Sequence, residues 1–102
     1  MPLIKLADVA EVPAGTGREV RVAGKVLALF NLDGVFYALA NECTHMGGPL
    51  GKGAVNGTTV TCPWHGSRFD VRTGQVVEPP ARRPVVTYPV QVRDGAVYAD
   101  LP

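Results

Sequence analysis

Two short segments contain every cysteine and every histidine of this 102-residue chain, which has two of each. Cys43 and His45 stand in the first segment, and Cys62 and His65 stand in the second. Thiolate sulfur and imidazole nitrogen are both good ligands for transition metals. In a reducing compartment, cysteines placed just before histidines favour a metal site over a disulfide. The pattern therefore predicts a metal centre with two sulfur and two nitrogen ligands.

The residues around these four positions resemble one family closely. Residues 43–48 read Cys-Thr-His-Met-Gly-Gly, and residues 62–70 read Cys-Pro-Trp-His-Gly-Ser-Arg-Phe-Asp. Both stretches are similar to the ligand loops of the Rieske [2Fe–2S] family. The resemblance extends to residues 71–75 and 88–90, which are similar to the small ferredoxins of ring-hydroxylating dioxygenases.

The resemblance implies a [2Fe–2S] cluster and assigns its ligands. Cys43 and Cys62 would hold the inner iron, whereas His45 and His65 would hold the outer iron near solvent. Two neutral imidazoles in place of two thiolates make such a cluster less negative, so it accepts an electron more readily. Rieske centres accordingly lie at roughly −150 to +300 mV, against about −400 mV for plant-type ferredoxins.

Residues next to the ligands are expected to contribute to the cofactor site. Gly47, Gly48 and Gly66 lack side chains, so their backbone could approach the cluster and point amide N–H groups at sulfur. Trp64 and Met46 could cover the cluster or form an apolar rim around it. The two ligand loops are thus expected to supply both the ligands and their surroundings.

Three positions differ from the respiratory members of the family. Those members carry a disulfide between the two loops, where this chain has Gly48 and Trp64. They also carry a tyrosine whose hydroxyl bonds a cysteine sulfur, where this chain has Phe69. Ser67 remains, so one side-chain hydrogen bond to the cluster is expected. Because fewer donors stabilise the reduced cluster less, the reduction potential is expected below about 0 mV.

The resemblance implies a one-electron carrier rather than an enzyme. A flavin-dependent reductase would be the electron donor, and a terminal oxygenase would be the acceptor. An oxygenase needs a second, mononuclear iron with two histidine ligands, and this chain has no histidine to spare. It also lacks the Gly-x-Gly-x-x-Gly fingerprint of dinucleotide-binding proteins. The alternatives are a small Rieske subunit of another complex such as nitrite reductase, a scaffold held together by structural zinc, or a redox sensor.

The elements that must position the ligands are predicted to be β-strands. The chain is rich in turn residues, with 12 glycines and 9 prolines, and its apolar residues are dominated by valine. Asp33-Gly34, Asn56-Gly57 and Asp94-Gly95 predict hairpin turns. Residues 6–9 are the best candidate for a helical turn. Strands are expected at residues 18–22, 25–30, 35–39, 54–55, 58–61, 68–71, 75–77, 87–92 and 96–100.

The prediction is one all-β domain of small antiparallel sheets, spanning residues 1–102. Residues 41–83 are expected to form a cluster-binding sub-domain inserted into a β base. The net charge of +1 gives no basis for binding nucleic acid or an anionic membrane. Because no apolar run approaches about 18 residues and no signal-peptide core stands at residues 1–5, a cytoplasmic, soluble protein is expected.

Overall fold

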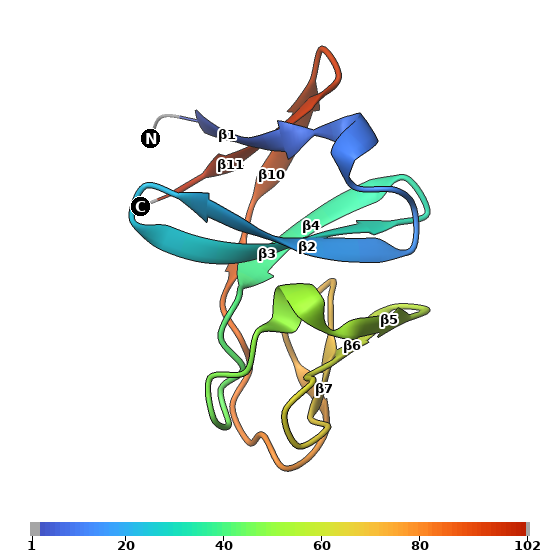
Figure 1. The fold of residues 1–102 in the computed structure, drawn as a ribbon, viewed down its shortest axis with the longest axis vertical. Helices are drawn as coiled ribbons and strands as arrows, with labels where there is room; N and C mark the ends of the chain where they lie inside the picture. The colour runs from blue at the N-terminus through green and yellow to red at the C-terminus, as the bar shows by residue number, and fades with distance from the viewer. Residues whose placement is uncertain (1–2, 102) are drawn as a thin grey trace.

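The computed structural model describes residues 3–101, so residues 1, 2 and 102 of the predicted domain lie outside the described part. The chain forms three antiparallel sheets, which confirms the all-β prediction (Figure 1). The first sheet has the order β1 (Leu3–Asp8), β11 (Ala96–Asp100), β10 (Val90–Arg93). The central sheet has the order β2 (Thr16–Val22), β3 (Lys25–Leu32), β4 (Val35–Ala40), β9 (Thr87–Tyr88). The third sheet has the order β5 (Ala54–Asn56), β6 (Thr59–Thr61), β7 (Arg68–Asp70), β8 (Val76–Glu78).

Three hairpins turn on pairs of residues with positive φ. The angles are 51° and 76° at Ala23–Gly24, 56° and 94° at Asp33–Gly34, and 49° and 77° at Asp94–Gly95. A tight two-residue turn whose twist matches that of the flanking strands requires positive φ at both of its residues. The turns predicted at Asp33-Gly34 and Asp94-Gly95 therefore form for the expected reason.

The hairpin between β5 and β6 is shifted by one residue from its predicted position. Asn56 pairs with Thr59, so the two turn residues are Gly57 and Thr58 rather than Asn56 and Gly57. Gly57 has φ of 62° and takes the first turn position, where a glycine suits the alternative two-residue turn. Strand β6 consequently begins at Thr59.

The predicted helical turn at residues 6–9 is wrong. Leu6 and Ala7 belong to β1, and a single 3₁₀ turn, η1 (Val9–Glu11), follows that strand. The pairing of β1 with β11 is irregular between Lys5 and Ala7, and both Leu6 and Ala7 are buried. Such a bulge places neighbouring residues on the same side and breaks the two-residue period that marks a strand in a sequence.

The central sheet is packed on both faces, and β3 shows this most clearly. Leu27 and Leu29 belong to a core shared with the first sheet, whereas Ala28 and Phe30 belong to a core shared with the third sheet. In Figure 1 the first sheet lies above the central sheet and the third lies below it. The second core also contains both cysteines, so the predicted metal centre rests on packed side chains.

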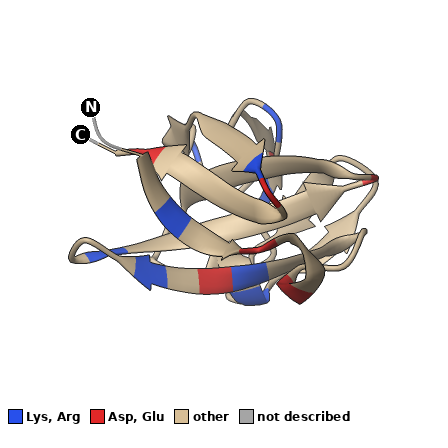
Figure 2. Cartoon of the chain, turned by 90° about the horizontal axis from the view of Figure 1, so that it is seen from above, with Lys and Arg blue, Asp and Glu red and all other residues tan. Residues whose placement is uncertain are grey.

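The third sheet lies within residues 41–83, for which the sequence predicts a sub-domain; that division stays a prediction. Viewed from above, basic and acidic residues are interspersed over the ribbon, in keeping with the small net charge (Figure 2). Among residues 3–101, no helix is long and apolar enough to cross a membrane.

Candidate metal centre

The loop at residues 62–67 joins β6 to β7 and carries the second pair of predicted ligands. The amide N–H of Cys62 donates to the carbonyl of Ser67 at 2.7 Å, which closes the loop at its base. His65 and Gly66 follow at the exposed tip, with φ of 70° and 77°. A non-glycine residue is uncommon in this left-handed region, and such strain is often found at functional positions. The backbone at His65 is thus held in a conformation that the sequence alone did not reveal.

The loop at residues 41–49 connects β4 to a second 3₁₀ turn, η2 (Leu50–Lys52), and carries the first pair. The amide of Cys43 donates to the carbonyl of Gly48 at 2.9 Å, with the same spacing as in the other loop. The amide of Gly47 donates to the carbonyl of Cys43 at 2.8 Å. The Gly47 amide therefore has an acceptor within its own loop, and its role toward a cluster sulfur stays a prediction. The corresponding roles of the Gly48 and Gly66 amides stay predictions.

The two loops bring the four predicted ligands to one place. The ring centroids of His45 and His65 are 5.3 Å apart, with the rings at 82° to each other, and both histidines are exposed. Cys43 and Cys62 are free thiols that are only 3% and 2% exposed. Sulfur donors therefore lie inside the protein and nitrogen donors lie at its surface, as the resemblance implies.

Burial determines the chemistry of the Cys62 thiol. Removal from water raises its pKa, the backbone amide of Trp64 acts in the opposite direction, and the neighbouring Cys43 raises the pKa further. The raised pKa means that the proton leaves readily only when a positive charge replaces it. A pair of buried, adjacent thiols is thus suited to a cationic metal group.

The four predicted donors form two neighbouring pairs, one of buried thiols and one of exposed imidazoles. A structural zinc ion would need all four donors around itself. A [2Fe–2S] cluster of the Rieske type divides them, two histidines on one iron and two cysteines on the other. The donor set of this chain therefore fits the cluster.

Gly48 lies where the two loops meet. A Cβ atom added there would be 2.5 Å from Sγ of Cys62 and 3.1 Å from Cβ of Trp64. The absence of a side chain lets the first loop lie directly against the second. The positions of Gly48 and Trp64 thus face each other, but neither is a cysteine, so no disulfide can join the loops there.

The indole of Trp64 and the side chain of Met46 extend to the surface, where the two residues are 50% and 61% exposed. Both therefore lie at the surface near the histidines, where an apolar rim was predicted. Ser67, in contrast, is completely buried. Its side-chain oxygen accepts a hydrogen bond from the amide of Ala81 at 3.0 Å, so its own hydroxyl proton remains available to a further acceptor.

A third segment, residues 79–84, lies against both ligand loops. The hydroxyl of Thr44 donates to the carbonyl of Arg83 at 2.7 Å, and the amide of Ala81 donates to Ser67. The ligand motifs alone do not assign this segment to the centre. Its three prolines, at positions 79, 80 and 84, were the available signal of a stiff, ordered segment.

Replacing Ser67 by alanine is expected to destabilise the folded protein by about 1–3 kcal/mol, because the buried amide of Ala81 loses its acceptor. Urea unfolding of the cluster-loaded protein measures the loss. Thr59→Ala is the matched control. The Thr59 hydroxyl donates to the carbonyl of Asn56 at an exposed site, where water can replace the lost hydrogen bond. Equal midpoints for the two variants would show that the bond between Ser67 and Ala81 is unimportant.

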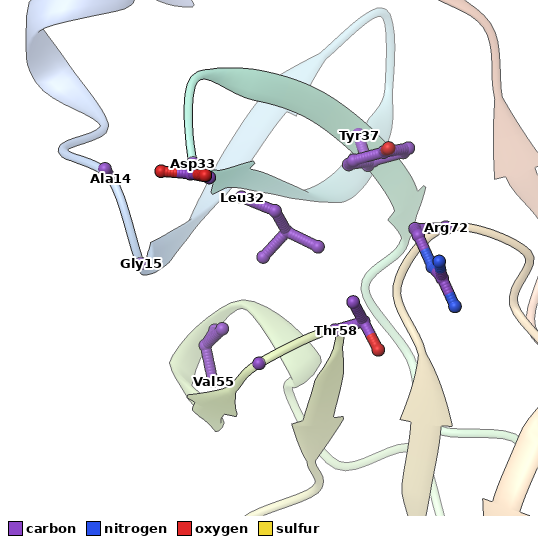
Figure 3. Close-up of a pocket in the computed structure, with 9 residues that line it drawn as sticks. Ala14, Gly15, Leu32, Asp33, Tyr37, Val55, Thr58 and Arg72 are labelled. Atoms are coloured by element: carbon purple, nitrogen blue, oxygen red, sulfur yellow. The ribbon is translucent and has the colours of Figure 1, made fainter.

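A separate hollow of about 560 Å³ lies between the Asp33–Gly34 turn and the β5–β6 hairpin (Figure 3). Asp33, Tyr37 and Arg72 are among the residues that line it. It contains none of the predicted ligands, so it is not part of the metal centre.

Comparison with known proteins identifies the family. The family model of the Rieske [2Fe-2S] domain matches residues 3–89. The 3-phenylpropionate/cinnamic acid dioxygenase ferredoxin subunit of Escherichia coli (strain K12) is 38% identical over 103 residues, covering 100% of this chain and 96% of that protein.

Two solved structures show the same fold. A ferredoxin of Sphingomonas yanoikuyae B1 has a TM-score of 0.94 and 37% identity, covering 99% of this chain and 100% of its own. A chain from the complex of reduced oxygenase and oxidized ferredoxin in carbazole 1,9a-dioxygenase has a TM-score of 0.89 and 34% identity, covering 95% and 91%. These matches extend over almost the whole chain, and its donor set fits the cluster of the matching domain. The chain therefore belongs to the Rieske [2Fe–2S] family, and a [2Fe–2S] cluster is its cofactor.

Proposed function

We propose that this protein is a one-electron carrier that delivers electrons to a terminal oxygenase. The observation that carries the proposal is that the same two loops hold a pair of neighbouring exposed imidazoles and a pair of buried thiols. A carrier needs one edge of its cofactor near solvent, where a partner can approach, and the rest shielded from water. The relatives described above support this function because they are ferredoxins of dioxygenase systems.

Each ligand has a distinct role in this proposal. Cys43 and Cys62 hold the inner iron within the second core, and His45 and His65 hold the outer iron at the surface. When bound, a [2Fe–2S] cluster takes up one electron and gives it up again. The loops change little during this exchange, because their bases are closed by backbone hydrogen bonds and residues 79–84 are bonded to both.

The proposed electron donor is a flavin-dependent reductase, and the proposed acceptor is a terminal oxygenase. Both would meet the histidine edge in small, transient encounters. Two cysteines that are not joined by a disulfide suit a reducing compartment, so we place this exchange in the cytoplasm.

Reduction of aerobically purified protein, followed by EPR and metal analysis, tests the proposal. A rhombic signal with a low average g value and two irons per chain are expected. One zinc ion per chain without iron would instead identify a zinc-stapled scaffold. A loaded protein that accepts electrons but passes none to an oxygenase of its host would point to another complex, such as a nitrite reductase.

The reduction potential is expected below about 0 mV, because Phe69 offers no hydroxyl to the cysteine sulfurs with which it shares a core. Phe69→Tyr should raise the potential by adding such a donor. Phe36→Tyr is the matched control, since Phe36 is buried in the core on the opposite side of the central sheet. Protein-film voltammetry measures all three proteins. A wild-type potential of about +200 mV or more, within the range known for Rieske centres, would contradict this prediction.

A further inference from the structure

Arg82 and Arg83 are exposed, unpaired charges beside the predicted ligand His45. Five of the ten basic residues form ion pairs with neighbouring acids, namely Lys5, Arg18, Lys52, Arg68 and Arg72. Among residues 3–101, neither Arg82 nor Arg83 has an acidic partner within ion-pair distance. Their charge is therefore available to a group outside this chain.

The backbone beneath these arginines is fixed to the metal centre. The hydroxyl of Thr44 holds the carbonyl of Arg83 at 2.7 Å, and Ser67 holds the amide of Ala81 at 3.0 Å. Thr44 lies next to His45, and Ser67 lies in the loop that carries His65. The backbone that carries both arginines is thus anchored relative to the histidine edge, whereas the arginine side chains remain free to reach outward.

A hollow of about 420 Å³ lies between the arginines and the histidine. Thr44, His45, Pro80, Arg82 and Arg83 line it. A carboxylate entering this hollow would find two cations close to the exposed imidazole. Arginine is well suited to such a contact, because its planar group binds a carboxylate with two parallel hydrogen bonds.

Acidic residues on the neighbouring surface do not neutralise the positive charge of the two arginines. A second hollow, of about 500 Å³, shares Thr44 and Arg83 with the first and is also lined by Glu42. Glu42 is the one acidic residue lining either hollow, against two arginines. The exposed side chains of Met46 and Trp64 add apolar area near the histidines, which is typical of the centre of a protein interface.

We propose that Arg82 and Arg83 select the terminal oxygenase by binding carboxylates on the face of that protein that surrounds its electron-accepting centre. This inference rests on the proposed function, because it names the chemistry of the acceptor at the same histidine edge. Residues 79–84 thus hold the ligand loops through their backbone and recognise the partner through their side chains.

The binding test uses the cluster-loaded protein and the purified terminal oxygenase and reductase of its host. Arg82→Glu and Arg83→Glu should each lower the association rate constant with the oxygenase roughly threefold to tenfold at low ionic strength. The difference should disappear at about 0.5 M salt, where such charges are screened. Arg93→Glu is the matched control, because it makes the same change in net charge at an exposed site on β10.

A second readout needs no protein partner. The anionic oxidant ferricyanide should take the electron from Arg82→Glu several-fold more slowly than from the wild type, and a cationic cobalt(III) phenanthroline complex should take it faster. Normal EPR spectra in every variant would show that the cluster is intact and reducible, so that weaker binding could be assigned to the arginines rather than to loss of the cofactor. Unchanged oxygenase binding in both variants, or an effect confined to the reductase, would overturn the inference. An equal effect in Arg93→Glu would also overturn it.

Discussion

Replacing His45 by alanine is expected to yield a protein without a stable [2Fe–2S] cluster. The variant removes one of the two nitrogen donors that the structure places with ring centroids 5.3 Å apart. Because His45 is exposed, water would occupy the vacated position and the iron would be lost. We expect at least tenfold less iron per chain than in the wild type and no rhombic EPR signal on reduction. Mutation of residues that only support metal ligands already lowers metal affinity, so loss of a ligand should lower it at least as much.

Met46→Ala is the matched control for this variant. Met46 adjoins His45 in the same loop and is 61% exposed, so its truncation should leave iron content and spectra unchanged. His45→Cys is expected to retain a cluster weakly, with altered spectra and a lower potential, since a thiolate adds negative charge. Normal iron content and g values in His45→Ala would remove this residue from the ligand set.

Gly74→Ala is expected to destabilise the folded protein by roughly 2–5 kcal/mol. Gly74 has φ of 78°, where an L-residue costs about 1–2 kcal/mol. A Cβ atom there would also collide with the carbonyl of Val85 and lie 3.2 Å from Cγ2 of Thr87. Overpacking against backbone adds roughly 1–3 kcal/mol, because the neighbouring segment must move.

Gly95→Ala separates these two contributions. Gly95 has nearly the same φ, 77°, but among the described residues no atom lies within 4 Å of the added Cβ. Its cost should therefore be limited to about 1–2 kcal/mol from the backbone conformation. Thermal or urea unfolding of the loaded proteins measures both variants. Equal destabilisation would show that the approach of Val85 to Gly74 does not constrain the fold.

The Gly74 variant should also affect the metal centre. The amide of Val85 donates to the carbonyl of Gly74 at 2.9 Å, immediately after the 79–84 segment. Displacement at this bond would loosen the attachment of Ala81 and Arg83 to the ligand loops. We therefore expect the variant to lose iron faster than Gly95→Ala at the same temperature.

The parts of the fold that local residues determine could be predicted from the sequence. Asp33-Gly34 and Asp94-Gly95 specify tight hairpins because aspartate and glycine both tolerate positive φ. Strand β1 (Leu3–Asp8) could not be recognised, because its bulge removes the alternation and its partner strand lies at the other end of the chain. The turn predicted at Asn56-Gly57 forms one residue later, at Gly57 and Thr58, since the pairing of β5 with β6 decides which residues turn.

Residue type was enough to predict which side chains come together at the centre, whereas contacts that depend on backbone geometry could not be predicted from it. The proximity of the two histidines followed from the motif. The engagement of the Gly47 amide with Cys43 did not, because it depends on the path of the loop. The role of residues 79–84 was missed because hydrogen bonds through Ala81 and the carbonyl of Arg83 leave little trace in residue type.

The pairing of the first and last strands has a practical consequence. β1 and β11 lie side by side, with Leu3 opposite Asp100, in the sheet at the opposite end of the molecule from the ligand loops (Figure 1). A reporter, an affinity tag or an electrode linker attached beyond either strand would point away from the histidines. Fusion at both ends at once should therefore leave electron exchange undisturbed, which makes the protein suitable for oriented immobilisation.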